Sequence, residues 1–527
     1  MVITLRKVLL VFLFLLVIAA TLLALKLSAV PVFFKFGEEP TRYDLLIKEA
    51  LVIDGSGDKG FEGDIGIIDK RITAVGDLNA VGDVEIDSSG LVAAPGFINP
   101  HSHVDQIIEE NPDAAASLLQ GVTTEIVGMD GQSALDLDKH FKHVISDGIA
   151  VNYGSMVGQG SVRRSVVGEN NRRASQNEIN TMKSLVEQAM EQGAFGLSTG
   201  LEYVPGIYTP TEEIIELAKA AAPYNGIYAS HIRNESDRIV SAVREALDVG
   251  RKAGTAVVIS HIKVGTKATG AGSEKIIMQN TAKVISLIEE YRQSGGKVYA
   301  DLYPYRVPWF QINRKLNEVF WQVPDSRIII SRSSKKSYVG KTLAEAAEAE
   351  NIAPGVLAQR LIADPETRVC VLRLSEDSIR TLLQEDFTMV SMDNNITWDN
   401  IASRPPTHPR NYGTYPRVLG KYVRENKVLT LEQAVHKMTG LTASVYGIDH
   451  RGLIKEGYFA DIVIFDPKRV NDRATYWKPE VPPAGIIHVL VNGRQAVRHG
   501  EYIYVSSDKI HPRGVRSGMI LKKATRQ

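Results

Sequence analysis

Residues 95–105 read PGFINPHSHVD, a short apolar segment that runs into closely spaced histidines. A short apolar run, GFIN, leads into two histidines separated by one residue, His101 and His103. On a β-strand, residues i and i+2 point to the same side, so both imidazoles can meet one cation. An isolated His-x-His motif is also typical of polar or surface histidines. Whether His101 and His103 bind a metal therefore depends on the rest of the chain.

Seven further short apolar runs follow along the chain: TTEIVG, NYGSMVG, FGLSTG, IYASHI, AVVISHI, KVYADLY and TMVSMD. Helical patterns lie between them, for example over residues 211–224 and 274–295. This alternation favours βα units and a parallel sheet. Eight such units predict an α/β fold, a closed (β/α)8 barrel of the TIM type. An open doubly wound sheet is the alternative, but no Gly-rich phosphate loop opens its first helix.

A polar side chain stands at the end of each predicted strand. In chain order these residues are His101, Asp130, Gln159, Glu202, His231, His261, Asp301 and Asp393. The common spacing of about 30 residues matches one βα unit. In a barrel of this type the C-terminal ends of the strands form the active-site face. We therefore expect these side chains to meet at one mouth.

Imidazoles and carboxylates that converge in this way predict a divalent metal site. The candidate ligands are His101, His103, Asp130, His231, His261 and Asp393. Nitrogen and oxygen donors without thiolate suit one or two Zn²⁺ ions, and manganese, cobalt and nickel stay open. Asp130 either bridges two cations, binds one, or only forms an Asp-Gly turn with Gly131.

Asp393 is the candidate catalytic residue. A carboxylate beside a metal-bound water can take its proton and pass it to a leaving amine. A plain metal ligand or a turn cap is the alternative role. Lys263, two residues beyond His261, suits a substrate carboxylate, with a surface ammonium as the alternative. Tyr203 and Tyr303 either donate hydroxyls to the substrate or pack in the core.

Two arginines of a later polar loop, Arg410 and Arg417, could each meet an anion, but an ordinary solvated role is favoured for both. The single cysteine, Cys370, excludes an internal disulfide framework and a multi-cysteine metal site. Lys+Arg and Asp+Glu both number 61, and this balance gives no indication of nucleic-acid binding.

Short alternating runs predict strands at both ends of the chain, including a hairpin at Asn492-Gly493. We expect a small β-sandwich built from residues 43–95 and 448–510, with the barrel over residues 96–447 and a C-terminal tail over 511–527. The step to the last barrel strand is long, which predicts an insertion at about 306–386. An insertion at the catalytic end would make a lid.

The N-terminus is predicted to be separate, with an anchor or signal segment and linker over residues 1–36. Residues 8–25 are 18 residues without a charge, preceded by Arg6 and Lys7. This length can cross a bilayer, and the flanking charges favour a cytoplasmic N-terminus. We expect a membrane helix with the catalytic part periplasmic or extracellular. A cleaved signal peptide, giving a secreted protein, is the alternative.

The motifs together resemble the amidohydrolase superfamily, and within it the D-aminoacylase (N-acyl-D-amino-acid deacylase) group. They include PGFINPHSHVD, ASHIRNE, SHIK, DLYPY and SMDNN, with GLSTGLEYVPG over residues 196–206 and HPRNYGTYPRVLG over residues 408–420. The resemblance implies a metal-bearing barrel with a small β-sandwich, which hydrolyses N-acyl-D-amino acids to a carboxylate and the free amino acid. It implies metal-binding roles for His101, His103, His231 and His261, a catalytic role for Asp393, and substrate contacts for Lys263, Tyr203 and Tyr303.

Three departures from the family pattern stand out. Asp130 occupies the place of a metal-binding cysteine, Gln159 that of a histidine, and residues 306–309 replace small hydroxyl residues. Two other functions stay open. One is a related enzyme for cyclic amides or dipeptides, of the hydantoinase, dihydroorotase or isoaspartyl dipeptidase type. The other is a non-catalytic binding protein on the same barrel.

Overall fold

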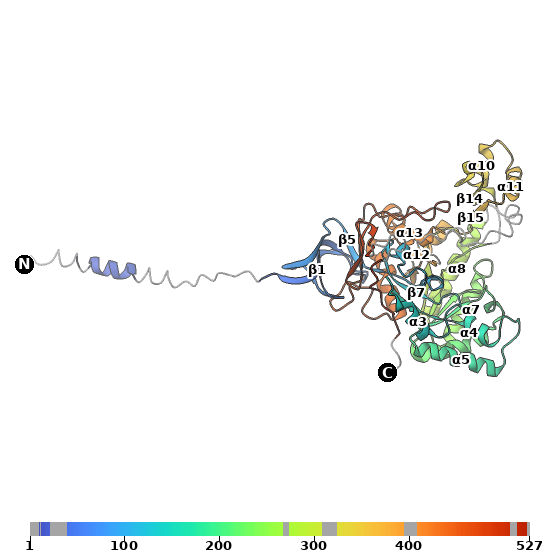
Figure 1. Ribbon diagram of the computed structural model, residues 1–527, viewed down its shortest axis with the longest axis horizontal. Helices are drawn as coiled ribbons and strands as arrows, with labels where there is room; N and C mark the ends of the chain where they lie inside the picture. The colour runs from blue at the N-terminus through green and yellow to red at the C-terminus, as the bar shows by residue number, and fades with distance from the viewer. Residues whose placement is uncertain are drawn as a thin grey trace, which may run out of the picture. The chain divides into compact units, whose positions relative to one another are not determined.

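The computed structural model describes residue 10 and residues 12–21, 39–266, 273–307, 324–394, 408–505 and 514–523 (Figure 1). The chain divides into two units, Met1–Thr41 and Arg42–Gln527. In the first unit, residues 12–21 are helical and exposed. The described helices include none with the length and apolar character needed to cross a bilayer. Much of the predicted anchor, residues 8–25, lies outside the described residues.

Eight parallel strand positions form a closed barrel, which confirms the TIM-type fold. They are β6 (Phe97–Asn99), β7 (Val122–Val127), β8 with β9 (Asn152–Ser155, Val157–Gly158), β10 (Gly196–Gly200), β11 (Ile227–His231), β12 (Val257–Ile259), β13 (Val298–Leu302) and β16 (Thr388–Val390). The eight apolar runs of the sequence contain these strands. One ladder runs β6-β7-β8 and the other β9-β10-β11-β12-β13-β16. A bridge between Ser102 and Asn394 joins the ends of the first and last strands.

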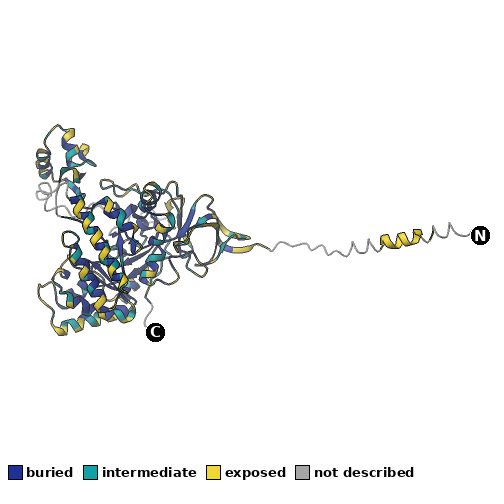
Figure 2. Cartoon of the chain, turned by 180° about the vertical axis from the view of Figure 1, so that it is seen from behind, coloured by how far each residue is buried: buried dark blue, intermediate teal, exposed yellow. Residues whose placement is uncertain are grey.

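Amphipathic helices cover the barrel, and their exposed outer faces contrast with the buried strands (Figure 2). The long ones are α3 (Leu137–Ser146), α5 (Gln176–Glu191), α6 (Thr211–Ala221), α7 (Ile239–Ala253), α8 (Ser273–Gln293), α12 (Glu376–Gln384) and α14 (Leu431–Met438). Local signals set their ends. Ser175 and Glu178 form a capping box at the start of α5, and Gly254 ends α7 in the left-handed conformation. Further helices are α2 (Ala115–Leu118), α4 (Gln159–Val166), α13 (Arg410–Arg417) and α15 (Gly440–Tyr446).

Strands from both ends of the chain share one sheet, in the order β20-β19-β18-β17-β5-β1-β2-β3, and β4 also pairs with β1. Their bounds are β1 (Thr41–Val52), β2 (Phe61–Ile68), β3 (Arg71–Gly76), β4 (Ala80–Asp87), β5 (Val92–Pro95), β17 (Ile462–Phe465), β18 (Ile486–Val491), β19 (Arg494–Arg498) and β20 (Glu501–Tyr502). Asn492 and Gly493 turn β18 into β19 with φ of 50° and 77°, as a type I′ hairpin requires.

A small lobe interrupts the barrel between β13 and β16. Its elements are β14 (Ile328–Arg332), β15 (Arg368–Val371), α10 (Leu343–Ala349) and α11 (Pro354–Ala363), which Figure 1 shows gathered at one corner. The lobe buries an apolar cluster of its own, which includes Ile328, Leu343 and Leu357. By contrast, α12 contacts α8 and β16, so the chain has returned to the barrel by residue 376.

A buried ion pair ties the two-ended sheet to the barrel. Arg451 pairs with Asp461, and their side chains are 2% and 4% exposed. The Asp461 carboxylate accepts a hydrogen bond from Asn152 of β8 at 3.0 Å, and Asn492 accepts one from Arg451 at 2.8 Å. A buried charge is tolerated only when it is paired and hydrogen-bonded in this way.

Replacing Arg451 with methionine should therefore leave the Asp461 charge buried without its partner. We expect a loss of about 3–5 kcal/mol of folding free energy, measured by urea unfolding. Arg42→Met, which removes an exposed pair with Asp83, is the matched control and should change little. Equal unfolding midpoints for Arg451→Met and the wild type would contradict the role of this pair.

Candidate metal centre

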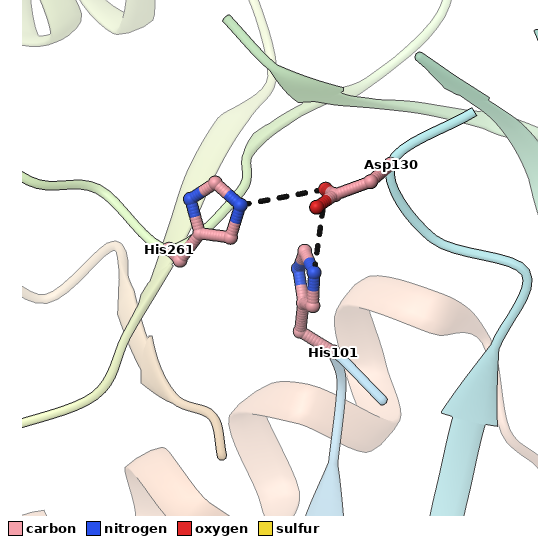
Figure 3. Close-up of side chains that lie close together, drawn as sticks. All are labelled: His101, Asp130 and His261. Carbon is pink, nitrogen blue, oxygen red and sulfur yellow. Dashed lines mark ion pairs between the residues drawn. The ribbon is translucent and has the colours of Figure 1, made fainter. Parts of the chain in front are cut away.

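The predicted ligands meet at the C-terminal mouth of the barrel. His231 is the last residue of β11, while His101 and His261 each stand two residues beyond β6 and β12. Asp130 and Asp393 follow β7 and β16 by three residues. All five are buried, and they come from five different strands. Figure 3 shows the imidazoles of His101 and His261 both directed at the Asp130 carboxylate.

Asp130 stands at the centre of this cluster. Its Oδ1 lies 3.4 Å from Nε2 of both His101 and His261. Its Oδ2 lies 3.6 Å from Nε2 of His103 and from Nδ1 of His231. One carboxylate is thus within 4 Å of all four predicted metal histidines, and a structural Asp-Gly turn would not require that convergence.

Asp393 closes the cluster from the last barrel strand. Its Oδ1 is 3.5 Å from Nε2 of His103 and 3.9 Å from Nε2 of His101. Three residues of the cluster have backbones in the left-handed region, with φ of 53° at Asp130, 34° at His261 and 47° at Asp393. Non-glycine residues adopt this region at a cost, and such strain is concentrated at functional sites.

Three of the four imidazoles have a second carboxylate behind them. The Nδ1 atom of His101 is 3.7 Å from Asp301, and Nε2 of His231 is 3.5 Å from Glu202. The Nδ1 atom of His261 is 3.0 Å from Glu235. Each ring therefore presents one nitrogen to the cluster and the other to an outer acceptor, which is how metal-binding histidines are oriented in proteins.

The donor set fits a divalent cation. Two buried atoms that face the cluster have no hydrogen-bond partner among the described residues, Nε2 of His101 and Oδ1 of Asp130. Leaving such atoms unpaired is costly, and a metal ion satisfies them. The candidate ligands fall into two groups that share His101, one with Asp130 and His261 and the other with His103 and Asp393. This arrangement has room for one or two ions.

The carboxylates control the charge of the imidazoles. Burial lowers the pKa of His101, but Asp130 and Asp301 outweigh burial and raise the pKa to about 9. In the same way, burial opposes the charged forms of His103 and His231, yet the facing carboxylates raise the pKa of each to about 10. Without a metal, these rings therefore hold protons at neutral pH.

A pocket of about 490 Å³ opens in front of the cluster. Lys263 lines it and pairs with Glu235, with 2.9 Å between Nζ and Oε2. Tyr203 also lines it, and its hydroxyl lies 3.4 Å from Nδ1 of His231. Tyr303 is buried behind the pocket, and its hydroxyl has no hydrogen-bond partner within the described part of the chain. All three predicted substrate residues are thus near the cluster.

One prediction about this region is wrong. Arg410 is not solvated but 4% exposed, and its guanidinium lies 2.7 Å from Oδ2 of Asp393 and over the ring of Tyr303. The sequence does not show that the loop after β16 turns back on the pocket. Arg417 is part-buried and pairs with Asp472 at 2.9 Å. The sequence analysis also does not single out Glu235, because its partners His261 and Lys263 follow another strand.

Comparison with known proteins agrees with this geometry. Residues 397–497 match the model of the amidohydrolase family. A D-aminoacylase and an N-acyl-D-glutamate deacylase of Alcaligenes xylosoxydans xylosoxydans are 36% and 34% identical over 476 and 475 residues. Each alignment covers 86% of this chain, with 94% and 93% of those proteins. The crystal structure of N-acyl-D-glutamate deacylase from Bordetella bronchiseptica, complexed with zinc and a phosphonate inhibitor, superposes with a TM-score of 0.74. It is 31% identical, and the match covers 91% of this chain and all of that one.

A barrel with histidines and carboxylates at its strand ends, in this family, defines a metal-dependent amidohydrolase. The chain belongs to the amidohydrolase family and, within it, to the D-aminoacylase group. The resemblance inferred from the sequence motifs is confirmed.

Metal uptake by this cluster should release protons. Ligand imidazoles must be neutral, whereas the pKa values of about 9 and 10 keep His101, His103 and His231 protonated at pH 7. Zinc titration of metal-stripped protein, followed by calorimetry in buffers of different ionisation enthalpy, should show this release. The apparent zinc affinity should rise from pH 6 towards pH 9. Heats that do not depend on the buffer would contradict this reading, and Asp130→Asn should release fewer protons.

Proposed function

We propose that the protein hydrolyses the amide bond of N-acyl-D-amino acids and releases a carboxylate and the free D-amino acid. The observation that carries this proposal is the pocket itself. Its lining brings the metal-ligand cluster together with two buried cations, Lys263 and Arg410. An N-acyl amino acid has matching parts, an amide to be cleaved and a carboxylate to be held. We assign Zn²⁺ as the metal, one or two ions, in line with the donor set.

Asp393 is placed to move the proton of the reaction. A bound divalent ion supplies an activated water and polarises the amide carbonyl. Asp393 is kept ionised, because Arg410 and the nearby imidazoles outweigh its burial and lower its pKa. The carboxylate can therefore accept the proton of the attacking water and return it to the amine as the C–N bond breaks. Arg410, at 2.7 Å, holds that carboxylate in place.

The cations on the pocket wall select the substrate. Lys263 and Arg410 can both reach a substrate carboxylate, and Arg410 can do so with a planar fork of donors. The unpartnered hydroxyl of Tyr303 can donate to the carbonyl or carboxylate oxygen of the substrate. The D configuration is supported by the names of the relatives, which act on N-acyl-D-glutamate or are D-aminoacylases.

Zinc-loaded protein should release free amine from N-acetyl-D-amino acids and not from their L enantiomers. Asp393→Asn should retain metal and lose about 10²–10⁴-fold in kcat, the usual contribution of general acid–base catalysis. Asp386→Asn, which changes an exposed aspartate paired with Arg292, is the control and should behave as wild type. The readout is amine release by a fluorogenic assay.

The proposal fails if metal-loaded protein releases amine from neither enantiomer. Activity on cyclic amides or dipeptides would then identify a hydantoinase-type or dipeptidase function. A protein that binds no metal at all would instead favour the non-catalytic binding role.

We also propose that the N-terminal segment anchors the enzyme in a membrane, with the catalytic part outside the cytoplasm. The support is the uncharged run over residues 8–25 after two basic residues. In addition, large apolar side chains such as Phe12, Leu13 and Phe14 are 63–67% exposed, which is costly in water.

Fractionation of cells that express the full chain tests this location. The full chain should stay in the membrane after alkaline carbonate washing, and added protease should reach it from the outer face. Residues 37–527 alone should be soluble. A full chain in the soluble cytoplasmic fraction would contradict the anchor, and a shortened secreted form would indicate signal cleavage instead.

A further inference from the structure

We propose that Glu235 is a positioning residue that holds His261 of the metal centre and Lys263 of the pocket with one carboxylate. The part that concerns Lys263 rests on the function proposed above. In this view, Glu235 couples the affinity of the centre for metal to the recognition of the substrate carboxylate.

The two oxygens of Glu235 serve different partners. Oε1 lies 3.0 Å from Nδ1 of His261, and Oε2 lies 2.9 Å from Nζ of Lys263. These side chains are well buried, with 18% exposure for Glu235, 9% for Lys263 and 1% for His261. Burial strengthens both interactions, because little water competes with the partners or screens their charges.

The backbone fixes Glu235 in this place. The residue lies on the loop after β11, and its carbonyl accepts a hydrogen bond of 2.9 Å from the amide of Gly265 on the loop after β12. The side chain of Asn234 accepts bonds from the amides of Ser236 and Arg238 at 3.1 and 2.8 Å. The loop is therefore tied both to itself and to the segment that carries His261 and Lys263.

The orientation of His261 follows from this contact. With Nδ1 directed at Glu235, its Nε2 faces Oδ1 of Asp130 at 3.4 Å and Nδ1 of His231 at 3.0 Å. A carboxylate on Nδ1 selects the tautomer with the proton there and leaves the Nε2 lone pair free for a cation. The same carboxylate occupies one donor of the Lys263 ammonium, which has three, and leaves the others for a substrate.

Glutamine at position 235 has nearly the same shape but cannot satisfy both partners. Its amide has one accepting oxygen and one donating nitrogen, whereas His261 Nδ1–H and Lys263 both need an acceptor. Glu235→Gln therefore tests the paired role with little change in volume. Glu235→Asp is a second variant, since its shorter side chain can reach one partner but not both.

Metal binding and kinetics are measured on the same zinc-loaded protein. For Glu235→Gln, competition with a chelator should show zinc bound about 10- to 100-fold more weakly, as expected when the carboxylate behind a ligand histidine is lost. At saturating zinc, KM for an N-acetyl-D-amino acid should rise about tenfold, because a charge-assisted contact that positions Lys263 is lost. The value of kcat should change less than KM.

Glu202→Gln is the matched comparison. Glu202 also lies behind a cluster histidine, with 3.5 Å between its carboxylate and Nε2 of His231, but it forms no ion pair with a lysine of the described residues. The Glu202→Gln variant should bind zinc more weakly than the wild type, without a rise in KM. In a Lys263→Met background, Glu235→Gln should no longer raise KM, because the lysine that it positions is gone.

The outcomes separate the two proposals. Wild-type zinc affinity and KM in both Glu235 variants would overturn the positioning role. Loss of zinc binding with unchanged KM at saturating zinc would make Glu235 a metal ligand only, and this also overturns it. If the wild type itself releases no amine from any N-acyl-D-amino acid, the proposed function fails, while the chelator competition still decides whether Glu235 holds His261.

Discussion

The Asp130 carboxylate, within 4 Å of four imidazoles, is the constraint on which the rest of the site depends. Six ionisable side chains meet at one barrel mouth, and five of them are buried. Burying these groups is costly unless each carboxylate and each protonated imidazole has a partner of opposite charge. Oδ1 of Asp130 lies near His101 and His261, and Oδ2 lies near His103 and His231, so one carboxylate contacts all four imidazoles. A carboxylate is a harder ligand than the cysteine typical of the family, and it should shift metal preference towards oxygen-loving cations.

Hydrogen bonds between the ends of the first and last barrel strands hold this cluster in place. The amide of Asp393 donates to the carbonyl of His101 at 3.0 Å, and the amide of His103 donates to the carbonyl of Asn394 at 2.7 Å. Below them, buried Glu125 accepts hydrogen bonds from Asn99 at 2.6 Å and from Asn394 at 3.4 Å. These hydrogen bonds therefore hold the ends of the first and last strands together where the His101/His103 pair meets Asp393. These contacts can stabilise cluster residues whose backbones lie in the left-handed region, despite the cost of that conformation.

Much of this could be read from the sequence, because barrel strands are short apolar runs whose ends carry the chemistry. The eight strands, His101, His231 and Asp393 all follow from that local pattern. Arg410 and Glu235 do not, since each acts through a loop whose path depends on tertiary contacts. Arg410 lies beyond the last strand, and only the folded chain shows it returning to Asp393. Glu235 becomes meaningful only when His261 and Lys263, from another strand, are placed beside it.

Anomalous scattering would show whether these side chains hold a metal ion. Crystals of the protein grown with zinc would be measured on both sides of the zinc absorption edge. The account predicts a strong anomalous peak enclosed by His101, His103, His231 and His261 and in contact with Asp130, present above the edge and absent below it. An ordered cluster with no such peak, in crystals that contain zinc, would contradict the account.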